Sequence, residues 1–228
     1  MARRRSNPLA LAVLECLSEK PMHPYEISAT LRTRGKEQSI KLNYGSLYSV
    51  VESLAKQGLI TAQHTTREGR RPERTVYTIT EAGQAELEDW LSELLSTPTR
   101  EYTSLEAGLS LVGALPPDEV AQLLDTRIVA LRIELGALER AEEICAEMKL
   151  PELFSIESQY RHALLTAELD FVQDLLTRIR KGTLGGSKLW RRTHELRAEG
   201  MSFDEIMADP VGHLGEEARA LLPREEQS

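Results

Sequence analysis

The amino-acid sequence predicts a mainly α protein, in which an N-terminal winged helix-turn-helix with a two-stranded β-hairpin precedes a C-terminal α-helical dimerisation region. Three patterns predict this fold class. Residues 43–60 place apolar side chains at the spacing of an amphipathic helix, and residues 61–80 form two β-prone segments around a loop that contains Gly and Pro. Residues 118–181 carry long, heptad-like runs of apolar side chains, which are typical of paired helices.

The order of these segments divides the chain into four parts. We expect a winged helix-turn-helix DNA-binding domain at residues 1–80 and a connecting helix at residues 81–98. A helical dimerisation domain should occupy residues 99–181, and residues 182–228 should form a flexible break followed by a helical tail of unknown role. A chain of 228 residues is long enough for one or two domains with hydrophobic cores.

Two helices are predicted ahead of residue 43. The first should run from Pro8 to about Glu19, because Asn7 is a favourable N-cap and Pro8 occupies the first helical position, where no backbone N–H is needed. The second should begin near Pro24 and end before Gly35. With the next helix and the hairpin, they give the element order of a winged helix-turn-helix.

The helix over residues 43–60 is the predicted DNA-reading element. Its apolar stripe comprises Leu47, Val50, Val51 and Leu54, and its opposite face is small and rich in hydroxyl groups near the N-terminus. Such a face lets the backbone approach the major groove, which the later helix of a helix-turn-helix enters N-terminus first. The candidate DNA-binding residues here are Lys41, Asn43, Tyr44, Gly45, Ser46, Tyr48, Ser49 and Lys56. Tyr48 lies about 100° from the stripe centre, so a flanking core position is the alternative.

The hairpin should carry a basic tip. Its strands are predicted at about residues 59–66 and 74–79. Arg70 and Arg71 in the loop and Arg74 at the second strand are further candidate DNA-binding residues, because a wing can reach phosphate or the adjacent minor groove. A solvated turn without a DNA role is the alternative for the arginine pair.

The distribution of charge favours a front domain that approaches phosphate. The net charge is −8, yet residues 1–80 contain 13 Lys and Arg against 7 Asp and Glu. The remaining residues contain 15 Lys and Arg against 29 Asp and Glu. A basic module on an acidic body fits nucleic-acid binding by the first part of the chain.

Other functional classes find little support in the sequence. No apolar run approaches the length of a membrane span, and Glu15 interrupts the apolar run after the basic N-terminus, so a cytoplasmic protein without a membrane partner is expected. Cys16 and Cys145 lie far apart on predicted helices, which argues against a disulfide. The five histidines show no metal-ligand spacing, and no phosphate-binding or dinucleotide motif occurs. We therefore expect no enzyme, no catalytic or metal-binding residues and no cofactor.

The front region resembles the PadR family of bacterial transcriptional regulators. The resemblance rests on PLALAVLECL, HPYEI, YGSLYSVVESLAKQGLI, GRRPERTVYTIT and the following EAG, in the family's order and spacing over about residues 8–90. It implies a homodimeric winged-helix protein, usually a repressor, on a double-stranded DNA operator that we expect to be palindromic. By position it also implies that Tyr25 is DNA-proximal, with Tyr44, Gly45, Ser46 and Tyr48. Many members of the family are released from DNA by a small molecule.

Long helices dominate the predicted C-terminal body. After a helix that ends at about residue 95 and a shorter one at 104–113, helices are expected at 118–149 and 151–181. The last helix has two apolar ridges, of which one can pack on the preceding helix while the other needs a second subunit. The predicted dimer-interface residues are Leu124, Ile128, Leu131, Leu135, Leu164, Phe171 and Leu175. A monomeric helical hairpin is the alternative.

Ligand control and the tail give two further hypotheses. Trp90, Tyr102 and Phe154 lie near the junction of the two regions, and Trp90 is the candidate residue for binding an aromatic or drug-like molecule, with a core position as its alternative. A constitutive DNA-binding regulator without a ligand, and a helical adaptor with a vestigial DNA-binding domain, are the alternative functions. In the tail, LRAEGMSFDEIM is faintly similar to a second helix-turn-helix, although packing onto the helical region is the preferred interpretation.

Overall fold

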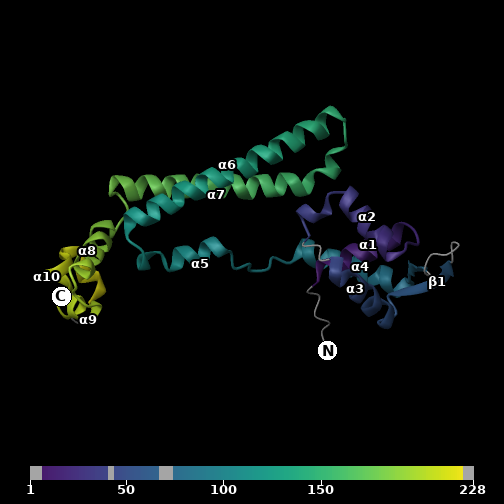
Figure 1. Ribbon diagram of the computed structural model, residues 1–228, viewed down its shortest axis with the longest axis horizontal. Coiled ribbons are helices and arrows are strands. Elements are labelled where there is room, and N and C mark those ends of the chain that lie inside the picture. Colours follow the sequence, from purple (N-terminus) through teal and green to yellow (C-terminus); the bar gives the residue numbers. More distant parts are fainter. Residues whose placement is uncertain (1–6, 41–43, 67–73, 223–228) are drawn as a thin grey trace. The chain divides into compact units, whose positions relative to one another are not determined.

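The structure is a computed structural model that describes residues 7–40, 44–66 and 74–222 (Figure 1). The chain divides into two compact units, residues 1–101 and residues 102–228, each with its own hydrophobic core. The elements of the first unit are α1 (Pro8–Glu19), α2 (Pro24–Thr33), a 3-10 turn (Lys36–Gln38), α3 (Tyr44–Lys56), β1 (Ile60–Thr66), β2 (Arg74–Ile79) and α4 (Glu81–Ser96). The predicted mainly α winged helix-turn-helix fold is confirmed.

Short-range capping explains where the first helices begin. The Asn7 side chain accepts a hydrogen bond of 3.1 Å from the Leu9 amide, which confirms the predicted N-cap of α1. At α2 the cap is His23, whose Nδ1 accepts from the Tyr25 amide at 3.1 Å. Glu26 completes a capping box by accepting from the His23 amide at 2.8 Å. Both helices thus satisfy orphan amide groups with side chains that lie next to them in sequence.

The core of the first unit joins all of its helices to the hairpin. Its fully buried members include Val13 and Leu14 of α1, Ile27 of α2, Val51 of α3 and Ile60 of β1. The apolar stripe predicted for α3 is confirmed, because all four of its members are buried in this cluster. The stripe therefore fixes which face of α3 is turned away from the core.

The hairpin is joined to the helical part of the first unit through the outer edge of β2. β1 and β2 pair antiparallel from Ile60 opposite Ile79, with a bulge between Ala62 and His64. Met22, just before α2, forms an isolated antiparallel bridge to Tyr77 of β2, with N–O distances of 3.0 Å in both directions. This bridge extends the two-stranded sheet by one residue pair, and it was not predicted from the sequence.

The second unit is helical throughout its described residues. Its elements are α5 (Ser104–Ser110), a 3-10 turn (Val112–Ala114), α6 (Pro117–Glu147), a 3-10 turn (Glu152–Phe154), α7 (Ile156–Lys181), α8 (Ser187–Ala198), α9 (Phe203–Ala208), α10 (Pro210–Leu214) and a 3-10 segment (Glu216–Leu221). Two predicted boundaries were wrong. The helix expected at 104–113 ends at Ser110, and the helix expected from Pro151 begins at Ile156, because a 3-10 turn precedes each of the following long helices.

α6 and α7 lie side by side as an antiparallel hairpin (Figure 1). Val172 and Leu176 of α7 pack with Val120 and Leu124 of α6 in a buried cluster. Ion pairs join the flanks of the two helices; the Arg127 Nη2–Glu168 Oε1 distance is 2.6 Å, and further pairs link Arg161 to Glu134 and Arg180 to Asp125. The register that these pairs define is antiparallel along the length of the hairpin.

Five of the predicted dimer-interface residues are already covered within the single chain. Leu124, Ile128, Leu131 and Leu135 of α6 and Leu175 of α7 are all buried. The second unit thus covers these side chains itself, and Leu124, Ile128 and Leu175 belong to the buried cluster of the helical hairpin. Of the predicted set, Leu164 and Phe171 stay on the surface, with 53% and 47% of their area exposed.

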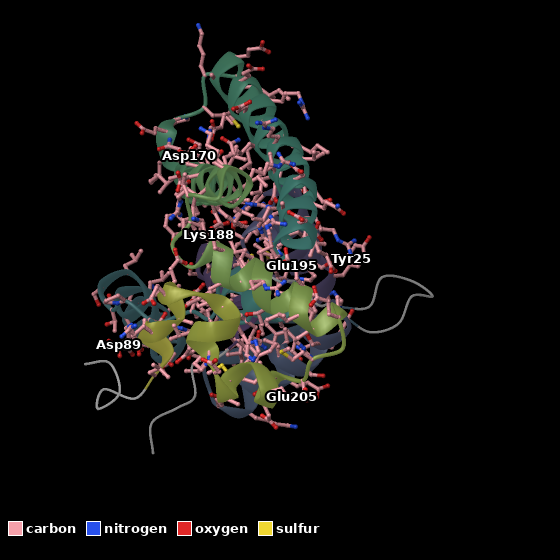
Figure 2. The ribbon with its side chains drawn as sticks, turned by 90° about the vertical axis from the view of Figure 1, so that its left-hand side faces the viewer. Tyr25, Asp89, Asp170, Lys188, Glu195 and Glu205 are labelled. Carbon is pink, nitrogen blue, oxygen red and sulfur yellow. The ribbon has the colours of Figure 1, made fainter. Side chains whose placement is uncertain are left out.

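The tail folds into a small helical cluster that packs on the start of α6. Leu196, Ile206, Leu214 and Ala218 form its buried core, and Figure 2 marks α8 with Lys188 and Glu195 and α9 with Glu205. The predicted capping box at α9 is confirmed, since the Ser202 hydroxyl accepts from the Glu205 amide at 3.2 Å and the Glu205 carboxylate accepts from the Ser202 amide at 2.7 Å. The Ser202 amide and the Ser202 hydroxyl both donate to the Glu205 carboxylate, and these two hydrogen bonds lower the pKa of Glu205.

Three side chains of α8 attach the tail to the α5–α6 connection. Trp190 Nε1 donates to the Leu115 carbonyl at 2.8 Å, and His194 Nε2 lies 2.9 Å from the Gly113 carbonyl. Arg191 forms a bidentate pair with Asp118, in which one N–O distance is 2.8 Å. The tail thus packs on its own helical unit.

Candidate nucleic-acid interface

The surface of α3 that faces away from the core matches the predicted DNA-reading face. Gly45, Tyr48, Ser49 and Lys56 are exposed, and Ser46 is half-buried. Tyr48 exposes 55% of its area, which excludes the alternative that it is a core residue. Apart from Glu52 and Lys56, this surface carries small or hydroxyl-bearing side chains that permit close approach of another backbone.

α2 adds an exposed aromatic side chain to the surface of the helix-turn-helix. Tyr25, labelled in Figure 2, occupies the first turn of α2 and is 69% exposed. An exposed tyrosine at a helix N-terminus can donate its hydroxyl to a phosphate oxygen, next to backbone amides that favour anions. The structure thereby places Tyr25 on the surface, as the family resemblance implied.

Several predicted DNA-binding residues lie outside the described part of the chain. Lys41, Asn43, Arg70 and Arg71 belong to residues 41–43 and 67–73. The backbones of Tyr44 and Arg74 begin α3 and β2, whereas their side chains are outside the described residues. The basic tip of the wing and the first contacts of α3 therefore stay predictions.

The base of the wing is held at a fixed position relative to α3. Thr80 Oγ1 donates to the Gly58 and Leu59 carbonyls at 2.8 and 3.0 Å, and it accepts from the Gly83 amide at 3.1 Å as the N-cap of α4. One hydroxyl thus connects the end of α3, the end of β2 and the start of α4. Gly83 is buried at this crossing, where α4 passes directly over the Leu59 carbonyl.

One residue on the α3 face was not among the predicted contacts. Glu52 is exposed between Ser49 and Lys56, at the helical spacing that selects the other members of the face. A carboxylate repels phosphate and accepts a hydrogen bond from cytosine N4, so it can affect which bases are tolerated. The helical period places this residue on the same face as Gly45, Ser49 and Lys56, so the sequence alone is sufficient to find it.

Trp90, the candidate ligand-binding residue, belongs to the core of the first unit. Its exposed fraction is 7%, and it packs in the same cluster as Leu87 and the α1 residues. This burial favours the core interpretation of Trp90. Tyr102 and Phe154, which motivated the same hypothesis, are exposed residues of the second unit.

Cys16 and the acidic clusters provide no reactive centre in the described segments. Cys16 is completely buried in α1, and burial raises its pKa to about 12, which keeps the thiol protonated and unreactive. Among residues 7–40, 44–66 and 74–222, no group of three or more His, Cys, Asp and Glu side chains could hold a metal ion. No helix in these ranges combines the length and apolarity that crossing a bilayer requires.

The fold and this surface define a DNA-binding transcriptional regulator of the winged helix-turn-helix class. Residues 13–89 match the model of the Transcriptional regulator PadR-like family. The chain therefore carries a PadR-like domain over these residues, and the proteins of that family are transcriptional regulators.

Characterised relatives agree with the family match. The negative transcriptional regulator PadR of Bacillus subtilis (strain 168) is 24% identical over 163 residues, which cover 71% of this chain and 88% of that protein. A crystal structure of Bacillus subtilis PadR in complex with operator DNA has a TM-score of 0.62 at 20% identity and covers 76% of this chain and 99% of its own. A structure of the same regulator with p-coumaric acid has a TM-score of 0.52 at 19% identity, covering 76% of this chain and 95% of its own. These structural similarities show a shared fold.

Proposed function

We propose that the protein is a cytoplasmic repressor that binds a palindromic operator as a homodimer and is released by a small molecule. The observation that carries the proposal is the exposed, hydroxyl-bearing face of α3, held against the core by its buried stripe. The name of the Bacillus subtilis relative, a negative regulator, and its complex with operator DNA support the sign and the target of this activity.

In this proposal α3 enters the major groove and the wing contacts the flanking backbone. Ser46, Tyr48 and Ser49 donate hydroxyl groups to base edges or phosphates, and Tyr25 and Lys56 contact phosphate. Lys41, Asn43, Tyr44, Gly45, Arg70, Arg71 and Arg74 complete the proposed DNA-binding set. Contacts from α3 determine sequence preference, whereas the basic residues mainly contribute affinity that depends on salt.

A second copy of the chain is the proposed partner of the exposed ridge on α7. Tyr160, Leu164 and Phe171 recur along one side of this helix and are exposed in the single chain. Two copies related by a two-fold axis would present two α3 helices to half-sites about 34 Å apart, one helical turn of DNA. The palindromic operator follows from that symmetry.

The proposed effector is a small aromatic molecule that releases the protein from its operator. The complex of Bacillus subtilis PadR with p-coumaric acid supports an aromatic effector. Because Trp90 is buried in the core of the first unit, this residue is not part of the proposed ligand site. Titration of aromatic acids against the protein–operator complex tests this part of the proposal, and a constitutive regulator is the conclusion if none of them lowers affinity.

Genomic footprinting followed by binding measurements tests the proposal as a whole. Tyr48→Ala should cost about 1–3 kcal/mol on the best site and change sequence preference. Charge reversal of Arg70 and Arg71 should weaken binding to all sequences and reduce the salt dependence by about one unit for each lost phosphate contact. Reversal of Lys188 and Arg197, two exposed cations of α8, is the matched control and should leave the salt dependence unchanged.

Sedimentation analysis tests the homodimer separately. Leu164→Glu combined with Phe171→Glu should give a monomer, because each change places a charge in the proposed apolar interface. Leu111→Glu, at an exposed apolar residue between α5 and the following 3-10 turn, is the control and should stay dimeric. A wild-type chain that sediments as a monomer and ignores all genomic DNA would favour the adaptor function instead.

A further inference from the structure

A cavity of about 430 Å³ opens at the tip of the helical hairpin, where α6 ends and α7 begins. Its walls include Glu142 and Cys145 of α6, Leu150, Glu152 and Phe154 of the connecting turn, and Gln159 of α7. The volume lies in the range of small-molecule sites, and the walls are formed by one continuous stretch of the second unit. Neither the proposed DNA contacts nor the buried core of the hairpin uses these side chains.

The carboxylates of Glu142 and Glu152 are the charged side chains that line the cavity. Glu142 and Glu152 bring a carboxylate from each side of the turn, and none of the lining residues is a lysine or arginine. The C-terminal end of α6, at Glu147, adds the partial negative charge of a helix C-terminus. Glu142 is kept in place by α7, since the Nδ1 atom of His162 lies 3.3 Å from one of its oxygens.

The remaining walls suit an apolar body. Phe154 and Leu150 present exposed apolar surface, and Cys145 and Ala146 close the side formed by α6. An aromatic face attracts a cation as well as an apolar group. The combination of an apolar wall, an aromatic ring and two carboxylates selects against anions and against strongly hydrated small ions.

We propose that this cavity binds an amphipathic organic cation, that is, a quaternary or protonated amine carried on an aromatic or aliphatic body. The ammonium group lies between the carboxylates of Glu142 and Glu152, and the apolar body packs on Phe154 and Leu150. The inference does not depend on the proposed repressor function, because binding of such a cation is measurable without DNA.

The chain contains a native reporter for occupancy of the cavity. Cys145 lines the cavity and is partly exposed, whereas Cys16 is completely buried and its pKa is raised to about 12. A neutral maleimide should therefore label Cys145 alone in the folded protein. A ligand in the cavity covers the Cys145 sulfur and slows the labelling.

The experiment measures the rate of N-ethylmaleimide labelling of the full-length protein in the presence of benzyltrimethylammonium. At a concentration about tenfold above Kd, the rate should fall about tenfold, because roughly a tenth of the sites are then empty. Glu142→Gln and Glu152→Gln should each raise Kd about two- to fivefold, the range for partly exposed charge pairs. Glu143→Gln removes the same charge from the neighbouring α6 residue, which does not line the cavity, and should leave Kd unchanged.

Three results would overturn the proposal. Absence of protection by benzyltrimethylammonium at millimolar concentration would exclude this ligand class, as would equal protection by benzenesulfonate, an aromatic anion of similar size. Protection that persists undiminished in the Glu142→Gln, Glu152→Gln double variant would exclude the carboxylates as the recognition element. Labelling that accelerates on dilution of the protein alone would show that a second copy of the chain, and not a small cation, fills the cavity.

Discussion

Replacement of Gly83 by alanine tests how the wing is attached to the rest of the first unit. Gly83 lies in the first turn of α4 and has no side chain between α4 and the hairpin. An added Cβ would lie 2.8 Å from Ile79 Cγ1 and 2.9 Å from the Leu59 carbonyl carbon, with the carbonyl oxygen nearer still. Such distances fall well inside van der Waals contact, so α4 or the hairpin must move.

The movement would disrupt more than one contact. Overpacking of a rigid site costs about 1–3 kcal/mol. The shift would also separate the Gly83 amide from Thr80 Oγ1, now 3.1 Å apart, and loss of an N-cap costs about 1 kcal/mol. We therefore expect Gly83→Ala to lower the free energy of unfolding of the first unit by about 2–4 kcal/mol.

Urea denaturation followed by circular dichroism measures this effect. Gly108→Ala is the matched control, because Gly108 is also helical and its added Cβ meets no atom within 4 Å. That control should stabilise its helix by about 0.5–1 kcal/mol, the usual gain when alanine replaces glycine in a helix. A Gly83→Ala protein within about 0.5 kcal/mol of wild type would refute the close approach of α4 to the Leu59 carbonyl.

Three other predictions concern charge and hydrogen bonding. Glu52→Gln removes a phosphate-repelling charge from the α3 face, so binding to non-specific DNA, measured by fluorescence anisotropy, should become about two- to fivefold tighter. Weaker binding would contradict the placement of Glu52 on the DNA-facing side of α3. The hydrogen bond from Arg34 lowers the pKa of Glu19 in the folded protein. The Arg34–Glu19 pair therefore adds to the free energy of unfolding at a pH above the unfolded carboxylate pKa, which is about 4.3. This stabilisation is lost as the pH falls through the lower pKa that Glu19 has in the folded protein. Glu19→Gln should therefore flatten the loss of stability between about pH 5 and pH 3, whereas an unchanged slope would show that the pair is not formed in solution. Trp190→Phe keeps an aromatic ring but loses the 2.8 Å hydrogen bond to the Leu115 carbonyl. The free energy of unfolding should fall by about 0.5–1.5 kcal/mol, and amide hydrogen exchange of the residues near Leu115 should become faster.

Features that depend on neighbouring residues could be predicted from the sequence. The start of α1 at Pro8 and the capping box at Ser202 each rest on side chains within three positions of the amide that they satisfy. The buried stripe of α3 follows from helical periodicity alone. Local chemistry therefore determined the element order and the outward face of the DNA-reading helix.

Features that join distant segments had no sequence signal. The Met22–Tyr77 bridge links residues that share no motif, and the bond from Trp190 to the Leu115 carbonyl uses a backbone group that any residue carries. Trp90 shows the same limit, because an aromatic residue on an apolar stripe suits a core and a ligand site equally well. Only the packing around Trp90 distinguishes the two.

The two ridges of α7 are equally apolar in the sequence, yet only some of their side chains are buried within the single chain. Val172, Leu175 and Leu176 are buried against α6, whereas Tyr160, Leu164 and Phe171 are about half exposed or more. Full burial of such a side chain contributes about 1.5–3 kcal/mol, so covering the exposed half of these three in two copies yields roughly 5–9 kcal/mol.

That gain is comparable to the cost of association, which is about 4–15 kcal/mol. The ridge alone therefore gives a marginal dimer. The net free energy of dimerisation is therefore small. Two charges at Leu164 and Phe171 should thus be sufficient to dissociate it, and a Leu164→Glu, Phe171→Glu protein that still sediments as a dimer would place the interface on another surface.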